Sequence, residues 1–244
     1  MADDSTIAIG LSQLDALAIR AIENAAPVRF ALAQSTVERE AVYRLRYKVI
    51  VERGWGRPEE YAGRSEQDHF DERAIQVVGL HDGALAASNR IVFPAAEQRL
   101  PTEETFQLAV EPVGCVTDWS RIIVARQYSC ASHRVLAGLI GQSWLETRHR
   151  GYSLICGIFS PGMIRLYNRM AFRFQTLSPL RSHFNEERVA VRLDLEATIA
   201  ALQERAPEGT LGRPRRQVRR LELPVQVFSE EENDQHILTL NRGS

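Results

Sequence analysis

The sequence predicts an α/β protein in which a central mixed, twisted sheet has helices on both faces. Apolar residues recur with a helical period in some segments and alternate with polar residues in others. Residues 116–159 have the pattern of a strand, a helix and a second strand, a crossover expected to be right-handed with its strands parallel. A chain of 244 residues that is 44% hydrophobic and 25% charged can also bury one full core.

The N-terminal elements are predicted from periodicity and from cap residues. The apolar residues of 11–24 fall on one helical face, and Pro27 ends that helix. A short strand is expected at 28–32. Ser35 and Glu38 then form a capping box ahead of a helix that runs to about residue 53.

The middle of the chain predicts two loops and a hairpin. Residues 54–73 contain glycine, proline and many charges, which indicates a long loop. The Asp82-Gly83 pair separates two apolar runs, as in a β-hairpin. Residues 95–114 are expected to be irregular, and the next strand, 115–125, is expected to be central in the sheet.

The later elements continue the alternation of helix and strand. Ser132 is the expected cap of the crossover helix. The remaining predictions are a helix at 132–149, a strand at 152–159, a helix at 160–170, strands at 172–177 and 188–195, a helix at 196–205 and a last strand at 224–228.

Composition excludes several classes of protein. A net charge of −1 gives no electrostatic case for binding nucleic acid or an anionic membrane. The three cysteines lack the spacing of a metal site and are expected to be reduced, mostly buried thiols. Residues 1–10 do not have the pattern of a signal peptide, and no apolar run approaches the ~20 residues that span a bilayer. We expect a cytoplasmic protein without a transmembrane segment.

Several charged side chains are placed to meet in one polar cavity. Within residues 42–71, Arg46 borders an apolar helical stripe, and two aspartates follow after a tryptophan. Two more arginines fall on predicted strands. Arginines and aspartates that are buried together are expected to pair, since an isolated buried charge costs several kcal/mol. The residues concerned are Arg46, Trp55, Asp68, Asp71, Arg90 and Arg121.

This pattern resembles a known family. The stretches that carry the resemblance are VYRLRYKVIVERGW, SEQDHFDERA, NRIVFP, DWSRIIV, RHRGYSLICGIFSPGMIRLYNRMAF and EERVAVRLDLEA. Together they resemble the autoinducer-synthase-like branch of the GNAT acyltransferase fold, over about residues 40–205. That branch includes FeeM-type N-acyl amino acid synthases and LuxI-type acyl-homoserine-lactone synthases.

The resemblance implies a set of acceptor-binding residues. Carried over by position, these are Arg46, Trp55, Asp68, Asp71, Arg90, Phe106 and Arg121. The chain departs from the lactone synthases at Asp118, where they typically have Glu, and at Ile50, where they usually have Phe. The departure at Ile50 favours a different acceptor.

The implied chemistry is transfer of a fatty acyl group from a thioester to an amine. A carboxylate with a pKa near ~4 is a poor base for an ammonium near ~9, so deprotonation needs a raised pKa or a relayed water. We assign this step to Asp118, for which the alternative is a salt bridge to a nearby arginine. Asp68 and Asp71 are expected to orient the site by pairing with Arg46 and Arg90, and the alternative for them is an N-cap or turn.

The thioester would lie along the central strands. In GNAT folds, backbone N–H groups donate to the developing oxyanion where two parallel strands diverge, which implicates Val124 to Arg126. Residues 126–131, with Ser129 and Ala131, resemble a degenerate phosphate turn, although an ordinary turn fits equally well. An acyl slot could be lined by Trp119, Trp144, Phe159 and Met163, for which plain core packing is the alternative.

One dense basic run lies near the C-terminus. Its arginines, Arg215, Arg216, Arg219 and Arg220, fit a docking surface for an acidic carrier protein. The alternatives are a solvated linker and, less in keeping with the charge, a nucleic-acid site. We divide the chain into an N-terminal helix and first strand (1–34), an acyltransferase core (35–205) and a basic linker with a C-terminal extension (206–244).

The sequence therefore predicts an N-acyltransferase that makes N-acyl amino acids. The expected partners are acyl carrier protein, whose acyl-phosphopantetheine is the donor, and a small amine, with peripheral contact to the lipid product. No metal and no tightly bound cofactor are expected. The alternatives are a lactone synthase that uses S-adenosylmethionine, and a domain that binds carrier protein or ligand without turnover.

Overall fold

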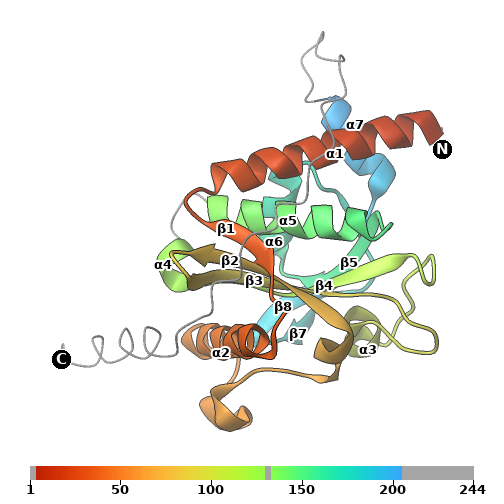
Figure 1. Cartoon of the computed structure of the whole chain (residues 1–244). Helices are drawn as coiled ribbons and strands as arrows, with labels where there is room; N and C mark the ends of the chain where they lie inside the picture. Colours follow the sequence, from red (N-terminus) through yellow and green to blue (C-terminus); the bar gives the residue numbers. More distant parts are fainter. Residues whose placement is uncertain (1–3, 130–132, 205–244) are drawn as a thin grey trace.

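A computed structural model describes residues 4–129 and 133–204 of the chain, and its central feature is one mixed sheet (Figure 1). The strand order is β1-β2-β3-β4-β5-β8-β6, and β7 pairs with β8. Every pairing is antiparallel except that of β4 with β5. The strands are β1 (Arg29–Leu32), β2 (Ala74–His81), β3 (Ala84–Val92), β4 (Val116–Val124), β5 (Leu154–Phe159), β6 (Phe174–Thr176), β7 (Arg181–His183) and β8 (Glu186–Leu193).

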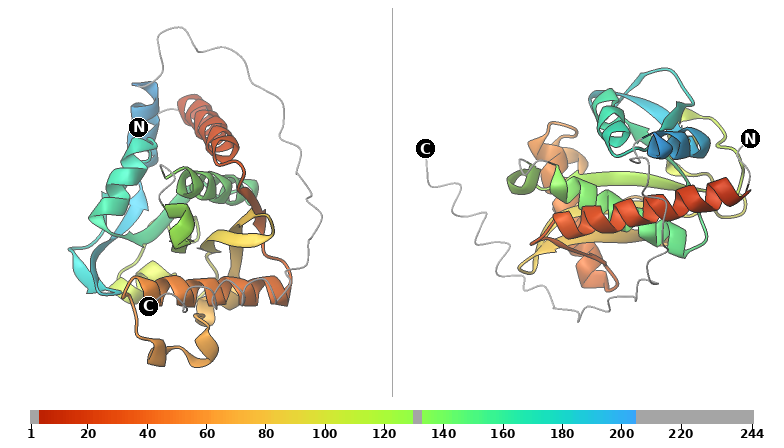
Figure 2. Two further views of the ribbon diagram at one scale, coloured as in Figure 1. Left: turned by 90° about the vertical axis from the view of Figure 1, so that its left-hand side faces the viewer. Right: turned by 90° about the horizontal axis from the view of Figure 1, so that it is seen from above.

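Helices cover both faces of this sheet, which confirms the predicted fold class. One face carries α1, α5 and α7, and α2 and α3 lie on the other (Figures 1 and 2). The helices are α1 (Asp4–Asn24), α2 (Thr36–Glu52), α3 (Pro101–Phe106), α4 (Arg126–Ser129), α5 (Arg134–His149), α6 (Pro161–Arg169) and α7 (Leu195–Gln203).

Local sequence signals explain two of the boundaries. The Ser35 hydroxyl accepts from the Glu38 amide, and the Glu38 carboxylate accepts from the Ser35 amide, so α2 begins with the predicted capping box. Asp82 and Gly83 both have positive φ, at 50° and 85°. A two-residue turn of that kind matches the twist of β2 and β3, and the predicted hairpin is confirmed.

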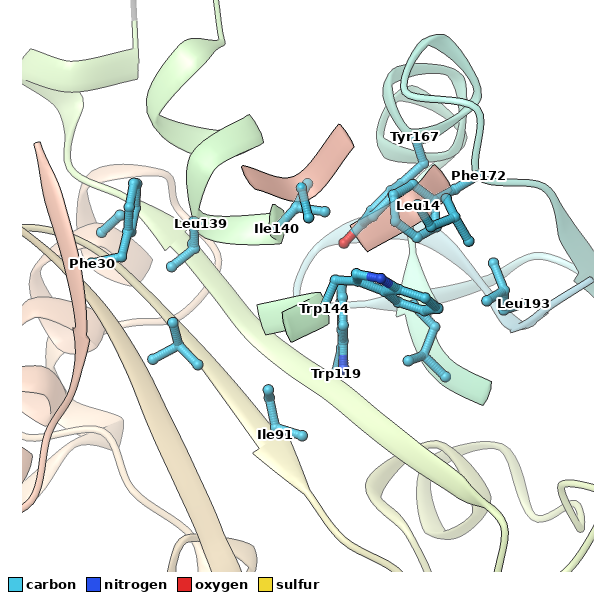
Figure 3. Packing of buried hydrophobic residues seen from close by; sticks show 14 of the residues in the cluster. Leu14, Phe30, Ile91, Trp119, Leu139, Ile140, Trp144, Tyr167, Phe172 and Leu193 are labelled. Carbon is cyan, nitrogen blue, oxygen red and sulfur yellow. The ribbon is translucent and has the colours of Figure 1, made fainter. Parts of the chain in front are cut away.

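The core lies mainly between the sheet and α1 and α5 (Figure 3). Trp119 of β4 and Trp144 of α5 are both buried at its centre, close to Leu14 of α1. The two helices approach closely because Gly141 has no side chain, and a Cβ there would lie 2.7 Å from the Ala18 carbonyl oxygen. This contact fixes α1 on the face of α5 that points away from the sheet.

Several expectations about local structure were wrong. Residues 54–73 are not a structureless loop, because they contain three short 3-10 helices, the last of which is η3 (His69–Arg73). Residues 95–114 contain α3, which Pro101 begins at its first turn. His133 stands at the N-cap position of α5, and Ser132, the predicted cap, lies outside the described residues. Strand β7 was not expected, and the strand predicted at 224–228 lies outside the described residues.

The N-terminal helix is longer than the periodicity predicted. It begins at Asp4, not at residue 11, and by length and composition alone it is long and apolar enough to cross a membrane. Polar residues such as Asp15 interrupt the apolar residues of this helix, so the sequence contains no unbroken apolar run here. A helix packed in a protein core can meet the same criterion, and α1 here contacts α5 and α7.

The cysteines also depart from expectation. Cys115 is exposed, Cys156 is buried, and Cys130 lies outside the described residues. Burial raises the pKa of the Cys156 thiol well above its ordinary value, so that sulfur is poorly suited to act as a nucleophile.

Candidate active site

A cavity of about 370 Å³ opens where the two parallel strands of the sheet diverge. Strands β4 and β5 are paired only from Val116↔Leu154 to Asp118↔Cys156. Beyond that point Trp119 to Ile123 line one wall, and Ile158 and Phe159 line another. A mostly apolar pocket with a few charged side chains is a typical place for a ligand.

Two aspartates shape one end of this cavity through the turn that contains them. Asp68 caps η3, because its carboxylate accepts from the Phe70 amide at 2.9 Å. The Asp71 carboxylate accepts from the Asp68 amide at 3.0 Å. The same two carboxylates bind arginines, so the two interpretations of this pair, cap and ion-pair partner, are both correct.

A largely buried ion-pair cluster forms part of the cavity wall. Arg46 donates to both oxygens of Asp71, at 2.9 and 3.0 Å, and also to Gln76. Arg90 donates to Asp68 and, at 3.2 Å, to Asp71. The predicted pairing of Asp68 and Asp71 with these arginines is confirmed.

The third arginine of this cluster depends on an irregular strand. Arg121 has a φ of 55° inside β4, and the register with β3 shifts at that point. Such a bulge re-aims a side chain, here toward the cavity end that holds Asp68. Arg121 donates to Asp68 at 3.0 Å and to Glu66 at 2.8 Å.

Glu66 is a further member of the cluster that was not predicted from the sequence. It is only 4% exposed and lies 3.7 Å from Arg46 as well as beside Arg121. The cluster therefore holds three arginines and three carboxylates, namely Arg46, Arg90, Arg121, Glu66, Asp68 and Asp71. Its charges balance, which is what makes their burial tolerable.

Asp68 is the member of this cluster best placed to meet a substrate. Its side chain is 27% exposed and lines the cavity. Burial would raise the pKa of Asp68, but Arg90 and Arg121 outweigh burial and hold it below its ordinary value. Asp68 is thus a stable anion, suited to bind an ammonium group and poorly suited to accept its proton.

Asp118 has the opposite properties. It is 1% exposed and does not line the cavity. Its carboxylate accepts from the Thr102 amide at the start of α3, at 2.8 Å, and lies 3.5 Å from the Cys156 sulfur. Burial raises the pKa of Asp118, and its Oδ1 has no hydrogen-bond partner within the described part of the chain. The sequence placed Asp118 on the central strand, but it did not indicate that the side chain would lie outside the cavity.

The predicted acyl and pantetheine residues are only partly brought together. Trp119, Phe159 and Met163 line the cavity. The Phe159 ring stacks on the buried Tyr167, with 5.0 Å between centroids. The other described members do not line it: Trp144 is core, Val124 packs against the core, and Arg126 and Ser129 lie on α4.

Three predicted groups remain to be placed. Phe106 is buried in α3 under the Arg181 guanidinium, 5.5 Å from its centroid, and does not line the cavity. Trp55 does line the cavity. Ala131 and the basic run that includes Arg215, Arg216, Arg219 and Arg220 lie outside the described residues.

The hairpin of β7 and β8 supplies a wall that the sequence did not reveal. Glu186 accepts from the Trp55 indole at 2.7 Å and from Arg188 at 3.1 Å. Phe184 lies under Arg121, with 4.9 Å from the guanidinium carbon to the ring centroid. Burial, together with Arg188 and Arg121, lowers the pKa of His183 to about 4, so this imidazole is neutral at pH 7.

Comparison with known proteins decides the family. The family model described as N-acyl amino acid synthase FeeM matches residues 41–194. The chain belongs to the FeeM family of N-acyl amino acid synthases. The match covers both the buried ion-pair cluster and the β7–β8 hairpin. A search of curated proteins finds no match.

Solved structures share the fold at low sequence identity. The AHL synthase LasI gives a TM-score of 0.59 at 17% identity, over 77% of this chain and 98% of that one. FeeM, an N-acyl amino acid synthase from uncultured soil microbes, gives 0.57 at 15% identity, over 72% and 97%. The CoA-dependent acyl-homoserine lactone synthase MesI gives 0.53 at 20% identity, over 72% and 94%. The predicted GNAT-like, autoinducer-synthase-like fold is therefore confirmed.

Proposed function

We propose that this member of the family transfers a fatty acyl group from the thioester of acyl carrier protein to the α-amine of an amino acid. The observation that carries the proposal is the mixed lining of the cavity. It presents the Asp68 carboxylate beside Arg90 and Arg121, and it also presents apolar side chains such as Ile122 and Phe159. A zwitterion fits the charged groups and an acyl chain fits the apolar ones.

Asp68 would hold the acceptor ammonium and fix its direction of attack. Its low pKa keeps it charged, and its capping bonds to η3 keep it in place. For two separate molecules, a large part of the reaction barrier is the loss of translational and rotational entropy. An amine that is already positioned beside a bound thioester has lost most of that entropy on binding, so its barrier is lower.

The proton that the ammonium must lose needs another acceptor. We assign it to Asp118, whose raised pKa suits a base better than that of Asp68. Because Asp118 does not line the cavity, it would act through an intervening group or water near its unpartnered Oδ1. Backbone N–H groups of the unpaired part of β4 would stabilise the developing oxyanion.

The donor is the less constrained half of the proposal. Carrier protein is favoured by the basic run at 213–220, whose charge suits an acidic partner. Free acyl-CoA is the donor to compare with it, since MesI is a CoA-dependent enzyme.

The direct test is release of free thiol by purified protein. Acyl carrier protein and CoA, each loaded with the same fatty acyl group, would be mixed with the twenty standard L-amino acids or with S-adenosylmethionine. We expect thiol release and an N-acyl amino acid with the carrier-protein donor. Transfer to S-adenosylmethionine alone would replace the proposal with lactone synthesis. Absence of thiol release with every donor and acceptor would instead support a domain that binds carrier protein or ligand without turnover.

A further inference from the structure

The buried ion-pair cluster has little capacity left for a substrate carboxylate. Each of its three guanidinium groups binds at least one carboxylate in the same cluster. Arg46 is fully buried and does not line the cavity. Within the described part of the chain, the Nη2 of Arg90 has no hydrogen-bond partner, but two carboxylates neutralise the charge of Arg90. A substrate anion at this end would also approach Asp68, which repels it.

A further arginine lines the same cavity and is less fully paired. Arg188 of β8 has a side chain that is 16% exposed, and Glu186 is its carboxylate partner, through Nη2 at 3.1 Å. Glu186 also accepts from the Trp55 indole at 2.7 Å. The Nε of Arg188 is buried and has no hydrogen-bond partner among residues 4–129 and 133–204.

Two aromatic rings lie close to the Arg188 guanidinium. The Arg188 guanidinium carbon lies 4.9 Å from the centroid of Trp55 and 5.7 Å from that of Phe184. Phe184 also contacts Arg121, so two arginines flank one ring. A flat guanidinium fixed by stacking loses less freedom when it binds a carboxylate than a free side chain does.

We propose that Arg188 binds the carboxylate of the amino acid acceptor, while Asp68 binds its ammonium. The proposal rests on the proposed function and specifies its acceptor: an α-amino acid with a free carboxylate. It also gives the β7–β8 hairpin a role in substrate selection. Because His183 is neutral, the positive charge on this wall of the cavity comes from Arg188 and Arg121.

The test compares an acid with its amide. The best acceptor among the twenty standard L-amino acids, and its primary amide, would be assayed with wild type and with Arg188→Gln. We expect kcat/KM for the acid to fall roughly 10- to 100-fold in Arg188→Gln, as for loss of one charged hydrogen bond, and kcat/KM for the amide to change little. Arg192→Gln, a change on the same strand at a residue outside the cavity lining, should keep the wild-type ratio.

Binding gives a second readout that does not need turnover. The acid, but not the amide, should raise the melting temperature of wild type, and Arg188→Gln should remove that difference. Arg188→Lys keeps the charge and should recover part of the preference for the acid. The melting temperature without ligand shows whether each variant is folded.

The outcomes separate this inference from the proposed function. If wild type transfers the acyl group but Arg188→Gln loses activity equally on acid and amide, or loses none, Arg188 does not bind the carboxylate. If the melting shifts follow the expected pattern but no amine is acylated, the proposed function fails and the Arg188 site stands. If neither pattern appears, both are overturned.

Discussion

At the scale of single residues, the acceptor side of the cavity is formed by the ion-pair cluster, in which each side chain makes more than one interaction. Asp68 caps a turn and also binds two arginines, and Arg121 reaches it from a strained position in β4. A non-glycine residue with positive φ is kept only where its surroundings enforce it. Here the two carboxylates that Arg121 binds supply that enforcement.

Removing Arg121 tests this arrangement. Arg121→Ala leaves Glu66 and Asp68 without a shared partner, and the acceptor end loses its geometry. We expect acyl transfer to fall to about 1% of wild type or less, since a small misplacement of reacting groups costs ~100-fold. Asp68→Ala should have the same effect. Thiol release measures both, with Arg29→Ala on the exposed end of β1 as control. Full activity in either variant would remove the cluster from the site.

Asp118 gives a prediction that depends on pH. Burial raises its pKa above the ordinary value of 3.8, so the folded protein binds this proton more tightly than the unfolded chain does. The charged carboxylate therefore destabilises the fold at pH 7, and the effect disappears as the pH falls below the unfolded value. Asp118→Asn should melt at the same temperature as wild type or higher at pH 7, with the difference shrinking toward pH 4.

The same variant tests the assigned role of Asp118 as base. Asparagine still accepts from the Thr102 amide but cannot take a proton, so the site should fold and react slowly. A positioned base contributes roughly 10²- to 10⁴-fold to the rate, and a loss in that range is expected in thiol release at saturating acceptor. Wild-type activity in a folded Asp118→Asn protein would show that Asp118 only supports α3.

What could be predicted at this scale followed from local spacing. Asp68 and Asp71 were identifiable because they lie three positions apart, after a tryptophan and a helical arginine. Glu66 was not, because its partners Arg46 and Arg121 come together only in the folded sheet. The orientation of the Asp118 side chain depends on its contact with α3. It could not be predicted, because the six residues of α3 are too few to show a helical period.

At the scale of elements, strand divergence creates the site. Strands β4 and β5 run parallel and paired for three residues, and the cavity begins where pairing ends. The crossover pattern predicted their parallel direction. The resemblance to GNAT folds placed the divergence near Val124, whereas the structure places it directly after Asp118, because pairing depends on the bulged path of β4.

The β7–β8 hairpin is the element that the sequence concealed. Strand β7 is a three-residue segment without alternation, so no pattern indicated it. It matters because Asn185 donates to the Gly54 carbonyl at 2.8 Å and Glu186 accepts from Trp55. These contacts join the hairpin to the end of α2 and complete the cavity wall.

The contact between α1 and α5 yields a stability prediction. A Cβ at position 141 would lie 2.7 Å from the Ala18 carbonyl oxygen, so Gly141→Ala must push the helices apart. Overpacking of this kind costs about 1–3 kcal/mol, and urea unfolding should show it. Gly162→Ala is the matched control, because its Cβ would meet atoms no closer than 3.7 Å. Equal stability of the two variants would contradict the close packing of α1 on α5.

At the scale of the whole molecule, the proposed carrier-protein donor requires a docking surface on this protein. The net charge of −1 gives no general attraction to an acidic protein, so a local basic surface is needed. The run at 213–220 is dense enough in arginine to provide one, and the described residues do not include it. Its role is therefore a prediction from sequence.

Neutralising this run tests the docking role. Replacement of Arg215, Arg216, Arg219 and Arg220 by glutamine should weaken binding to acyl carrier protein, and the weakening should be largest at low salt. Turnover with an acyl-CoA donor should be unaffected, since that donor needs no protein contact. Titration calorimetry at two salt concentrations measures the affinity. An unchanged affinity would make the run a linker.

We propose that this cavity joins an acyl group to the amine of an amino acid. Mass spectrometry of lipid extracts can test this, with cells that overexpress the chain compared with cells that express Arg121→Ala. We expect a new N-acyl amino acid that the variant does not make. A lactone, an unchanged lipid profile, or the same product from both proteins would contradict it.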